Sequence, residues 1–362
     1  MLECHRALNR VVEVMPTWTS FYKLAVSLLC SIILTAPCYA DQTLSANSQS
    51  DQALLKDKRF QQPANWQWHS FKNADGASIR YGQALVEKPN GTIVLVTGFT
   101  EFGEVYFELI NDLLEANYNV YEMDWRGEGG SDRYLEDREK AYSLGFEHDE
   151  NDLAQLIETI VKPQGKQKLI LMAHSLGSHI ALRFLHDHPG LIDKAILTAP
   201  AVELTSKENP TLISLATWWQ CTTGNGKKYI DDQGNWDFME PKVTKLITHS
   251  HDQERVRLEA AWAKQNPQLR SGGATWKWLQ EYQKSLDILW SDHYLAAVKT
   301  PVLVACPGED LIMKPYKQRQ CVRRLSNLTL YEAEGARHDL FLESDEFRRP
   351  WLEWALNWAR VN

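Results

Sequence analysis

The chain has 362 residues, of which 44% are hydrophobic and 24% are charged, and its formal net charge is −8. This length and composition suit one large core with an insertion and require no second independent domain. The modest negative charge, without a basic stripe, argues against nucleic acid as a partner.

The first forty residues have the pattern of a secretory signal peptide. Lys23 precedes an apolar stretch, residues 24–36, that is short for a membrane span, and small residues lead to a cleavage site at Ala40. We expect cleavage after Ala40 and export to the periplasm or the medium; an uncleaved anchor is the alternative, and Met15 is an alternative start. Residues 41–62 are polar and are expected to form a mobile leader.

Strands alternate with helices from residue 92 onward. Residues 92–97 are apolar and β-branched, as a parallel strand buried on both faces requires, and the loop after them can aim the backbone N–H of Phe99 at a substrate. A helical pattern over 107–114, a strand over 119–123 and a glycine-rich loop over 124–131 follow. This alternation predicts a doubly wound, mostly parallel sheet whose ligands bind at the strands' carboxyl ends.

Residues 169–178 contain the most informative motif. An apolar strand runs into Ser175, which has Ala173 two residues before it and Gly177 two residues after it, and helical sequence follows. A serine on a sharp strand-to-helix turn needs such small neighbours, and the turn places the backbone N–H of Leu176 where an oxyanion forms. Ser175 is therefore the candidate nucleophile, with Leu176 and Phe99 as candidate oxyanion donors.

The alternation breaks between residues 201 and 290, which we predict to be a helical cap. Half of the chain's 14 tryptophans lie in this segment, and its clearest helices are 255–265 and 276–289. Three tryptophans are candidate substrate contacts, namely Trp218, Trp219 and Trp276. The cap is also the candidate surface for peripheral membrane contact. The hydrolase core would then comprise residues 63–200 and 291–362.

The strand pattern returns at residues 301–305, and a loop with Glu309 and Asp310 follows it. A second strand pattern, residues 328–331, is followed by a loop that contains His338. A serine nucleophile needs a base to take its proton and an acid to orient that base, and the chain order Ser, Asp, His is that of the α/β-hydrolases. We predict Asp310 as the acid, with Glu309 as the weaker alternative, and His338 as the base.

Three cysteines, Cys221, Cys306 and Cys321, lie beyond the predicted signal peptide. In an oxidising compartment an odd number allows at most one internal disulfide, for which Cys306 and Cys321 are the candidates; three free thiols are the alternative. The sequence has no metal-ligand spacing among its histidines, cysteines and carboxylates, and the proposed chemistry needs neither a metal nor a cofactor.

Several segments together resemble the lysophospholipase and monoacylglycerol lipase branch of the α/β-hydrolases. The resemblance extends from about residue 92 to residue 358 and rests on residues 97–101 with Tyr106, 124–131, 172–177, 198–200 and 335–338. Cap residues 246–250 and 269–276 are similar to those of bacterial lysophospholipases in particular. The resemblance implies an α/β-hydrolase fold with Ser175 as nucleophile, Asp310 as acid, His338 as base, and Phe99 and Leu176 as oxyanion donors.

The chain departs from the family pattern near the entrance to the site. Thr97 replaces the histidine before the oxyanion loop, Pro307 replaces a glycine before the acid, and Trp125 and Glu128 stand where histidines are frequent. No departure removes a catalytic group. We expect a hydrolase of lipid carboxylic esters, acting on a lysophospholipid or a monoacylglycerol. The alternatives are a short-chain esterase, a serine aminopeptidase-like hydrolase and a non-catalytic binding protein on the same fold.

Overall fold

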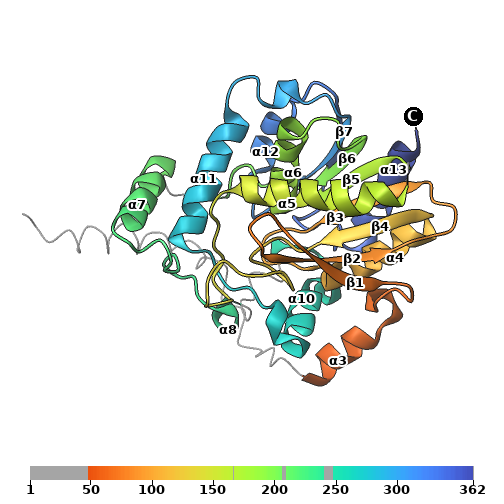
Figure 1. Ribbon diagram of the computed structural model, residues 1–362, viewed down its shortest axis with the longest axis horizontal. Helices are drawn as coiled ribbons and strands as arrows, with labels where there is room; N and C mark the ends of the chain where they lie inside the picture. Colours follow the sequence, from red (N-terminus) through yellow and green to blue (C-terminus); the bar gives the residue numbers. More distant parts are fainter. Residues whose placement is uncertain (1–47, 166, 206–208, 240–247, 362) are drawn as a thin grey trace, which may run out of the picture. The chain divides into compact units, whose positions relative to one another are not determined.

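In the part of the chain that the structure describes, eight strands form one sheet in the order β1-β2-β4-β3-β5-β6-β7-β8 (Figure 1). This computed structural model describes residues 48–165, 167–205, 209–239 and 248–361. Strands β3 to β8 run parallel, and β1 and β2 are antiparallel additions at one edge. The strands are β1 (Gln67–Lys72), β2 (Ser78–Ala84), β3 (Gly91–Val96), β4 (Tyr118–Met123), β5 (Leu169–His174), β6 (Lys194–Thr198), β7 (Val302–Pro307) and β8 (Leu328–Ala333).

Helices cover both faces of this sheet, which explains why its central strands are buried at every position and mostly apolar. On β3, Ile93 and Leu95 enter the core shared with α4 and α13, whereas Val94 and Val96 enter the core shared with α5 and α6. The predicted doubly wound, mostly parallel sheet is confirmed. These helices and their neighbour α12 have the bounds α4 (Phe107–Glu115), α5 (Phe146–Leu156), α6 (Ser175–Asp187), α12 (Pro315–Val322) and α13 (Asp345–Arg360).

The inserted segment between β6 and β7 contains helices joined by irregular chain in its described part. Its helices are α7 (Pro210–Thr222), α8 (Trp236–Met239), α10 (Gln253–Gln265) and α11 (Trp276–Trp290). The last two extend over the helices expected at 255–265 and 276–289. The chain divides into two compact units, and the described part of the smaller one is residues 209–216, the start of α7. All the remaining described elements belong to the larger unit.

Residues 48–60 differ from the mobile leader expected for them. They form α3 (Ser48–Lys56) and the short turn η1 (Lys58–Phe60), and Leu54 and Phe60 are buried against α10. Asp51 also accepts hydrogen bonds from Arg257 at 2.6 Å and Lys264 at 3.1 Å. A polar sequence thus acquires order because its few apolar side chains and one carboxylate meet complementary groups on another helix.

The cysteines beyond the predicted signal peptide are free thiols. Cys306 lies in β7 and Cys321 in α12, and both are buried. Burial raises the pKa of each thiol to about 12, which disfavours the reactive thiolate. The predicted signal peptide lies outside the described residues. Within the described ranges, no helix has both the length and the apolar character that a membrane span needs.

Candidate active site

Ser175 occupies the sharp turn between β5 and α6. It is the first residue of α6, directly after β5 ends at His174, and its φ of +50° is unusual for a residue with a side chain. A Cβ on Gly177 would lie 2.4 Å from the carbonyl oxygen of Thr97, so only glycine allows the helix to approach the end of β3. This packing holds the strained turn that presents the Ser175 hydroxyl at the carboxyl edge of the sheet.

His338 joins Ser175 to Asp310. Its Nε2 lies 2.8 Å from Ser175 Oγ, and its Nδ1 lies 2.7 Å from Asp310 Oδ2. All three side chains are buried. The serine and the histidine are 163 residues apart in the sequence. The turn after β5 and the loops after β7 and β8 bring them together because parallel strands end at the same edge of the sheet. This geometry suits proton transfer from Ser175 to His338.

The loop after β7 holds Asp310 rigidly. Its Oδ1 accepts hydrogen bonds from the backbone N–H groups of Ile312 and Met313, both at 2.8 Å, and its Oδ2 accepts one from Gln318 Nε2 at 3.0 Å. Burial alone would raise the pKa of Asp310, but His338 and the two backbone donors hold it below the usual range. Glu309, the alternative acid, is exposed. Gln318 belongs to α12, and nothing in the local sequence indicates its role.

The electrostatic environment of His338 favours its protonated form. Burial alone would lower the pKa of the imidazole, but the charge and hydrogen bond of Asp310 outweigh this effect and raise it to about 9. The carboxylates of Asp339 and Glu101 contribute in the same direction. A proton taken from Ser175 would therefore be well stabilised on His338.

Two further histidines lie beside the candidate base. Asp339 accepts hydrogen bonds from His174 Nε2 at 2.9 Å and His249 Nδ1 at 3.0 Å, and the ring centroids of these histidines are 4.9 and 6.0 Å from that of His338. Burial alone would raise the pKa of Asp339, but the two histidines hold it well below its usual range. The sequence analysis did not single out Asp339, although this carboxylate directly follows the predicted base in the chain.

The effect of Asp339 on His338 predicts a pH profile. The kcat/KM for a soluble ester should rise with pH through an inflection near the raised pKa of His338, about 9, rather than near the ordinary imidazole pKa of about 6.5, because only neutral His338 accepts the serine proton. Asp339→Asn removes a carboxylate that stabilises the imidazolium. The inflection should therefore move down, by about 1 pH unit. The measurement is kcat/KM against pH for both proteins, with the exposed Glu309→Gln variant as control; an unmoved inflection in Asp339→Asn would contradict the coupling.

The two candidate oxyanion donors come from different parts of the fold, the start of α6 and the loop after β3. Leu176 follows Ser175 in the first turn of α6, and Phe99 lies in the loop after β3 with its ring 4.4 Å from that of Trp278 on α11. Glu101 closes this loop by accepting hydrogen bonds from the Gly98 backbone at 2.6 Å and the Tyr106 hydroxyl at 2.5 Å. Burial raises the pKa of Glu101. The loop conformation is thus fixed before substrate binds, as an oxyanion site requires.

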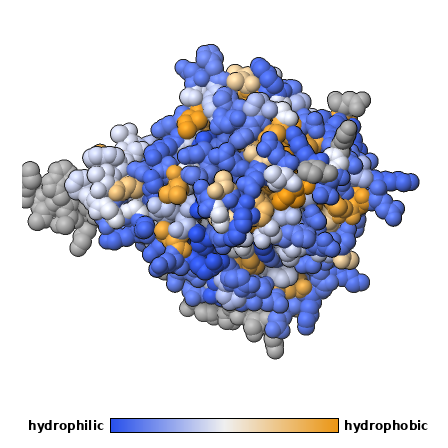
Figure 2. All heavy atoms as spheres, viewed as in Figure 1, coloured by the Kyte–Doolittle hydropathy of each residue, from blue (hydrophilic) through white to orange (hydrophobic). Residues whose placement is uncertain are grey.

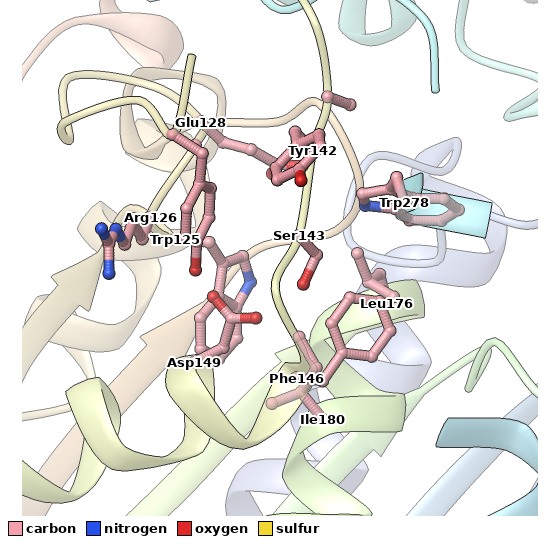
Figure 3. Close-up of a pocket in the computed structure, with 13 residues that line it drawn as sticks. Trp125, Arg126, Glu128, Tyr142, Ser143, Phe146, Asp149, Leu176, Ile180 and Trp278 are labelled. Atoms are coloured by element: carbon pink, nitrogen blue, oxygen red, sulfur yellow. The ribbon is translucent and has the colours of Figure 1, made fainter. Parts of the chain in front are cut away.

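A small pocket lies beside Leu176, with about 20 Å³ of free space, which is room for about one water molecule (Figure 3). Leu176 and Ile180 of α6, with Phe146 and Trp278, form its apolar part. Arg126 lies at the opposite end of the view from Trp278. Three polar side chains, those of Glu128, Ser143 and Asp149, also line the pocket. The lining thus combines apolar surface with acidic groups and the basic side chain of Arg126.

The tryptophans predicted to contact substrate do not line this pocket. Trp218 and Trp219 lie on α7 with 54% and 57% of their surface exposed, and Trp276 is buried at the start of α11. Trp278 and Trp125 line the pocket instead. The sequence contained an indication for Trp278, because Tyr282 lies one helical turn later and the two side chains must share a face of the helix. In the structure their rings stack, with centroids 5.4 Å apart.

One group of side chains among the described residues has the composition of a metal site. The ligand atoms of His174, His338 and Asp339 lie within 4.8 Å of one another. However, both nitrogens of His338 bond to Ser175 and Asp310, and both oxygens of Asp339 bond to histidines. A metal ion here would break the hydrogen bonds that define the triad, so we assign it no role.

Comparison with known proteins extends over most of the chain. The family model described as serine aminopeptidase, S33 (Hydrolase_4) matches residues 87–345. Lysophospholipase L2 of Escherichia coli (strain K12) is 27% identical over 290 residues, which are 77% of this chain and 83% of that protein. Monoacylglycerol lipase of Mycolicibacterium smegmatis is 25% identical over 149 residues, 41% of this chain and 51% of that protein. A soluble variant of monoglyceride lipase from Saccharomyces cerevisiae has the same fold, with a TM-score of 0.64, 19% identity, and coverage of 83% of this chain and 97% of that one.

Proposed function

This chain belongs to the Hydrolase_4 family of α/β-hydrolases, and from that premise we propose that it hydrolyses the acyl ester of a lysophospholipid. It is a carboxylic ester hydrolase; the headgroup is the proposed part. The hydrogen-bonded chain from Ser175 through His338 to Asp310 supports the reaction type. The similarity to lysophospholipase L2, over 83% of that protein's length, favours a lysophospholipid over a monoacylglycerol.

The geometry supports a two-step reaction. His338 Nε2 takes the proton of Ser175 as Oγ attacks the ester carbonyl, and the backbone N–H groups of Leu176 and Phe99 bind the oxyanion. Asp310 accepts a hydrogen bond from the Nδ1–H of His338, which leaves Nε2 unprotonated and able to accept the proton of Ser175. His338 then protonates the departing alkoxide of the glycerophosphodiester, which leaves as the alcohol, and the acyl group stays on Ser175 as an ester. Water, deprotonated by the same nitrogen, releases the fatty acid.

A substrate panel tests this assignment. Lysophosphatidylcholine and lysophosphatidylethanolamine, monomeric and below their micellar concentrations, should have higher kcat/KM than monoacylglycerols of equal chain length. Among p-nitrophenyl esters, kcat/KM should rise about fourfold per methylene until the pocket is full, because each buried methylene contributes about 0.8 kcal/mol. A flat profile, or preferred cleavage of amino-acid p-nitroanilides, would favour the short-ester or aminopeptidase alternative.

We also propose that α7 contacts the membrane that carries the substrate. Trp218 and Trp219, in the part of this helix that belongs to the larger unit, are both more than half exposed. On the face shown in Figure 2, hydrophobic side chains form small patches within a largely hydrophilic surface. Tryptophan is favoured at membrane interfaces, and burial of such side chains in lipid is favourable.

Replacing Trp218 and Trp219 together by serine should weaken binding to phosphatidylcholine vesicles by about tenfold or more, because two large apolar side chains no longer enter the lipid. Vesicle co-sedimentation measures this change. Trp354→Ser is the matched control, since Trp354 is 37% exposed on α13, outside the cap. Equal loss in both variants would show that membrane contact does not depend on α7.

We further propose that the protein is exported and that the mature chain begins at Asp41. The basis is the Lys23 to Ala40 pattern of a signal peptide. Sequencing the amino terminus of protein recovered from the periplasm decides this. Membrane-bound protein that retains Met1 or Met15 would indicate an anchor instead.

A further inference from the structure

The loop after β3 that contains Phe99 has a strained backbone. Thr100 has a φ of +66°, a conformation that is uncommon for any residue with a side chain and an outlier for a β-branched one. Such a conformation persists only where the surrounding structure holds it, and it is frequent beside catalytic groups. The backbone N–H of Phe99 donates to no acceptor among the residues that the structure describes. The strained loop thus leaves this N–H group available to a substrate oxygen.

Two buried carboxyl groups accept hydrogen bonds from the N–H groups on either side of Phe99. Glu101 accepts the one from Gly98 N–H at 2.6 Å, within the loop itself. Glu128, which follows β4 and is 5% exposed, accepts the one from Thr100 N–H. The peptide groups before and after the one that carries the Phe99 N–H are therefore both held in place. The direction of the Phe99 N–H depends on these two contacts.

Trp125 holds the start of the same loop. Its indole N–H donates a hydrogen bond to the carbonyl oxygen of Thr97 at 2.8 Å, and its side chain is buried. Trp125, Glu128 and Thr97 are also positions at which the sequence departs from the family pattern. In the structure these departures meet, because Trp125 and Glu128 bond to opposite ends of residues 97–100.

The segment that carries Trp125 and Glu128 is itself firmly held. Arg133 donates from Nη1 to the carbonyl oxygens of Glu128 and Ser131, both at 2.7 Å, and from Nη2 to that of Gly129 at 2.8 Å. The Glu128 N–H also donates to the carbonyl oxygen of Trp125 at 3.0 Å. A segment with its backbone fixed in this way can hold a strained neighbour.

We propose that Trp125 and Glu128 are positioning residues of the oxyanion site, which hold residues 97–100 so that the Phe99 N–H is directed at the developing oxyanion. They act through the loop. Both line the small pocket that Leu176, the other candidate donor, also lines (Figure 3). The proposal concerns ester hydrolysis at Ser175 and does not depend on the headgroup of the substrate.

Substitutions at Glu128 test the hydrogen bond to Thr100. Burial raises the pKa of Glu128 to about 8, so the carboxyl is mostly neutral at pH 7 and glutamine reproduces its shape, its charge and its acceptor. With p-nitrophenyl acetate, Glu128→Gln should have a kcat within about threefold of the parent. Glu128→Leu removes the acceptor and should lower kcat about 10²-fold with little change in KM, because removing one oxyanion donor costs about 10²- to 10³-fold.

Two further variants accompany this pair. Glu136→Leu is the matched control, since Glu136 is an exposed carboxylate later in the same connection, and its kcat should equal that of the parent. Trp125→Phe removes the donor to Thr97 and should lower kcat about fivefold. It tests the same support if thermal unfolding shows that Glu128→Leu does not fold. An unchanged kcat in Trp125→Phe, or equal losses in Glu128→Gln and Glu128→Leu, would overturn the proposal.

A transition-state analogue separates positioning from a general loss of structure. When a trifluoromethyl ketone binds, Ser175 Oγ adds to its carbonyl carbon, His338 takes the serine proton, and the carbonyl oxygen becomes an oxyanion. This ketone should bind Glu128→Leu about 10²-fold more weakly than the parent. The corresponding secondary alcohol forms no oxyanion and should bind both proteins equally.

Equal weakening for the ketone and the alcohol would overturn the positioning role. A parent that neither hydrolyses p-nitrophenyl acetate nor binds the ketone would overturn the reaction itself and this proposal with it. If the expected results are obtained with both compounds but the parent does not cleave lysophospholipids, the headgroup assignment is wrong and the role of Trp125 and Glu128 is supported.

Discussion

Ser175→Ala should lower kcat for ester hydrolysis by about 10⁴-fold or more, since the variant has no oxygen that can form the acyl-enzyme. The loss should be confined to chemistry. Alanine retains the Cβ that already tolerates a φ of +50°, and it removes only the hydroxyl that lies 2.8 Å from His338. KM for a soluble ester should therefore change little.

The control for this variant is its thermal unfolding, which should match that of the parent within a few degrees. A fluorophosphonate probe should label the parent at Ser175 and leave the variant unlabelled. Activity within tenfold of the parent would remove Ser175 from the mechanism. A parent that neither hydrolyses esters nor reacts with the probe would support the binding-protein alternative.

Asp310→Asn should reduce kcat by about 10³- to 10⁴-fold. Asparagine keeps the volume and can accept the hydrogen bonds from Ile312 and Met313, but its amide can donate to His338 Nδ1. Such a bond favours the wrong tautomer, with the proton on Nε2, where it cannot accept from Ser175. The carboxylate charge that stabilises the imidazolium is lost as well.

Glu309→Gln is the matched variant for this prediction. It removes the same charge from the neighbouring residue, but Glu309 is exposed and Asp310 alone lies 2.7 Å from the imidazole. We expect Glu309→Gln to change kcat by less than about threefold, as surface substitutions usually have small effects. The opposite ranking, measured by steady-state kinetics on one ester, would transfer the role of the acid to Glu309.

The sheet could be predicted because its signals are local. Strands such as β3 and β5 are buried on both faces, so each is a mostly apolar run bounded by a loop or a turn. The turn at Ser175 needs small neighbours, and this need is visible at Gly177 in the sequence itself. Chain order then indicated Asp310 and His338, because the ends of parallel strands meet.

Other features depend on contacts that local sequence does not specify. Asp339 matters through His174 and His249, which are 165 and 90 residues away. The exposure of Trp218 and the burial of Trp276 depend on how the cap helices pack, and a helix pattern fixes only which residues share a face. The pairing of Asp51 with Arg257 likewise crosses 206 residues.

The contact between α3 and α10 bears on where this protein can be shortened. Leu54 and Phe60 cover Leu258 and Ala261, so a version that starts at residue 63 would expose an apolar strip on α10. The same helix carries Arg255, which bonds to Glu108 of α4 at 2.6 Å. Loss of α3 would therefore also affect how α10 packs against α4. A trimmed protein intended for expression or crystallisation should keep everything from residue 48 onward.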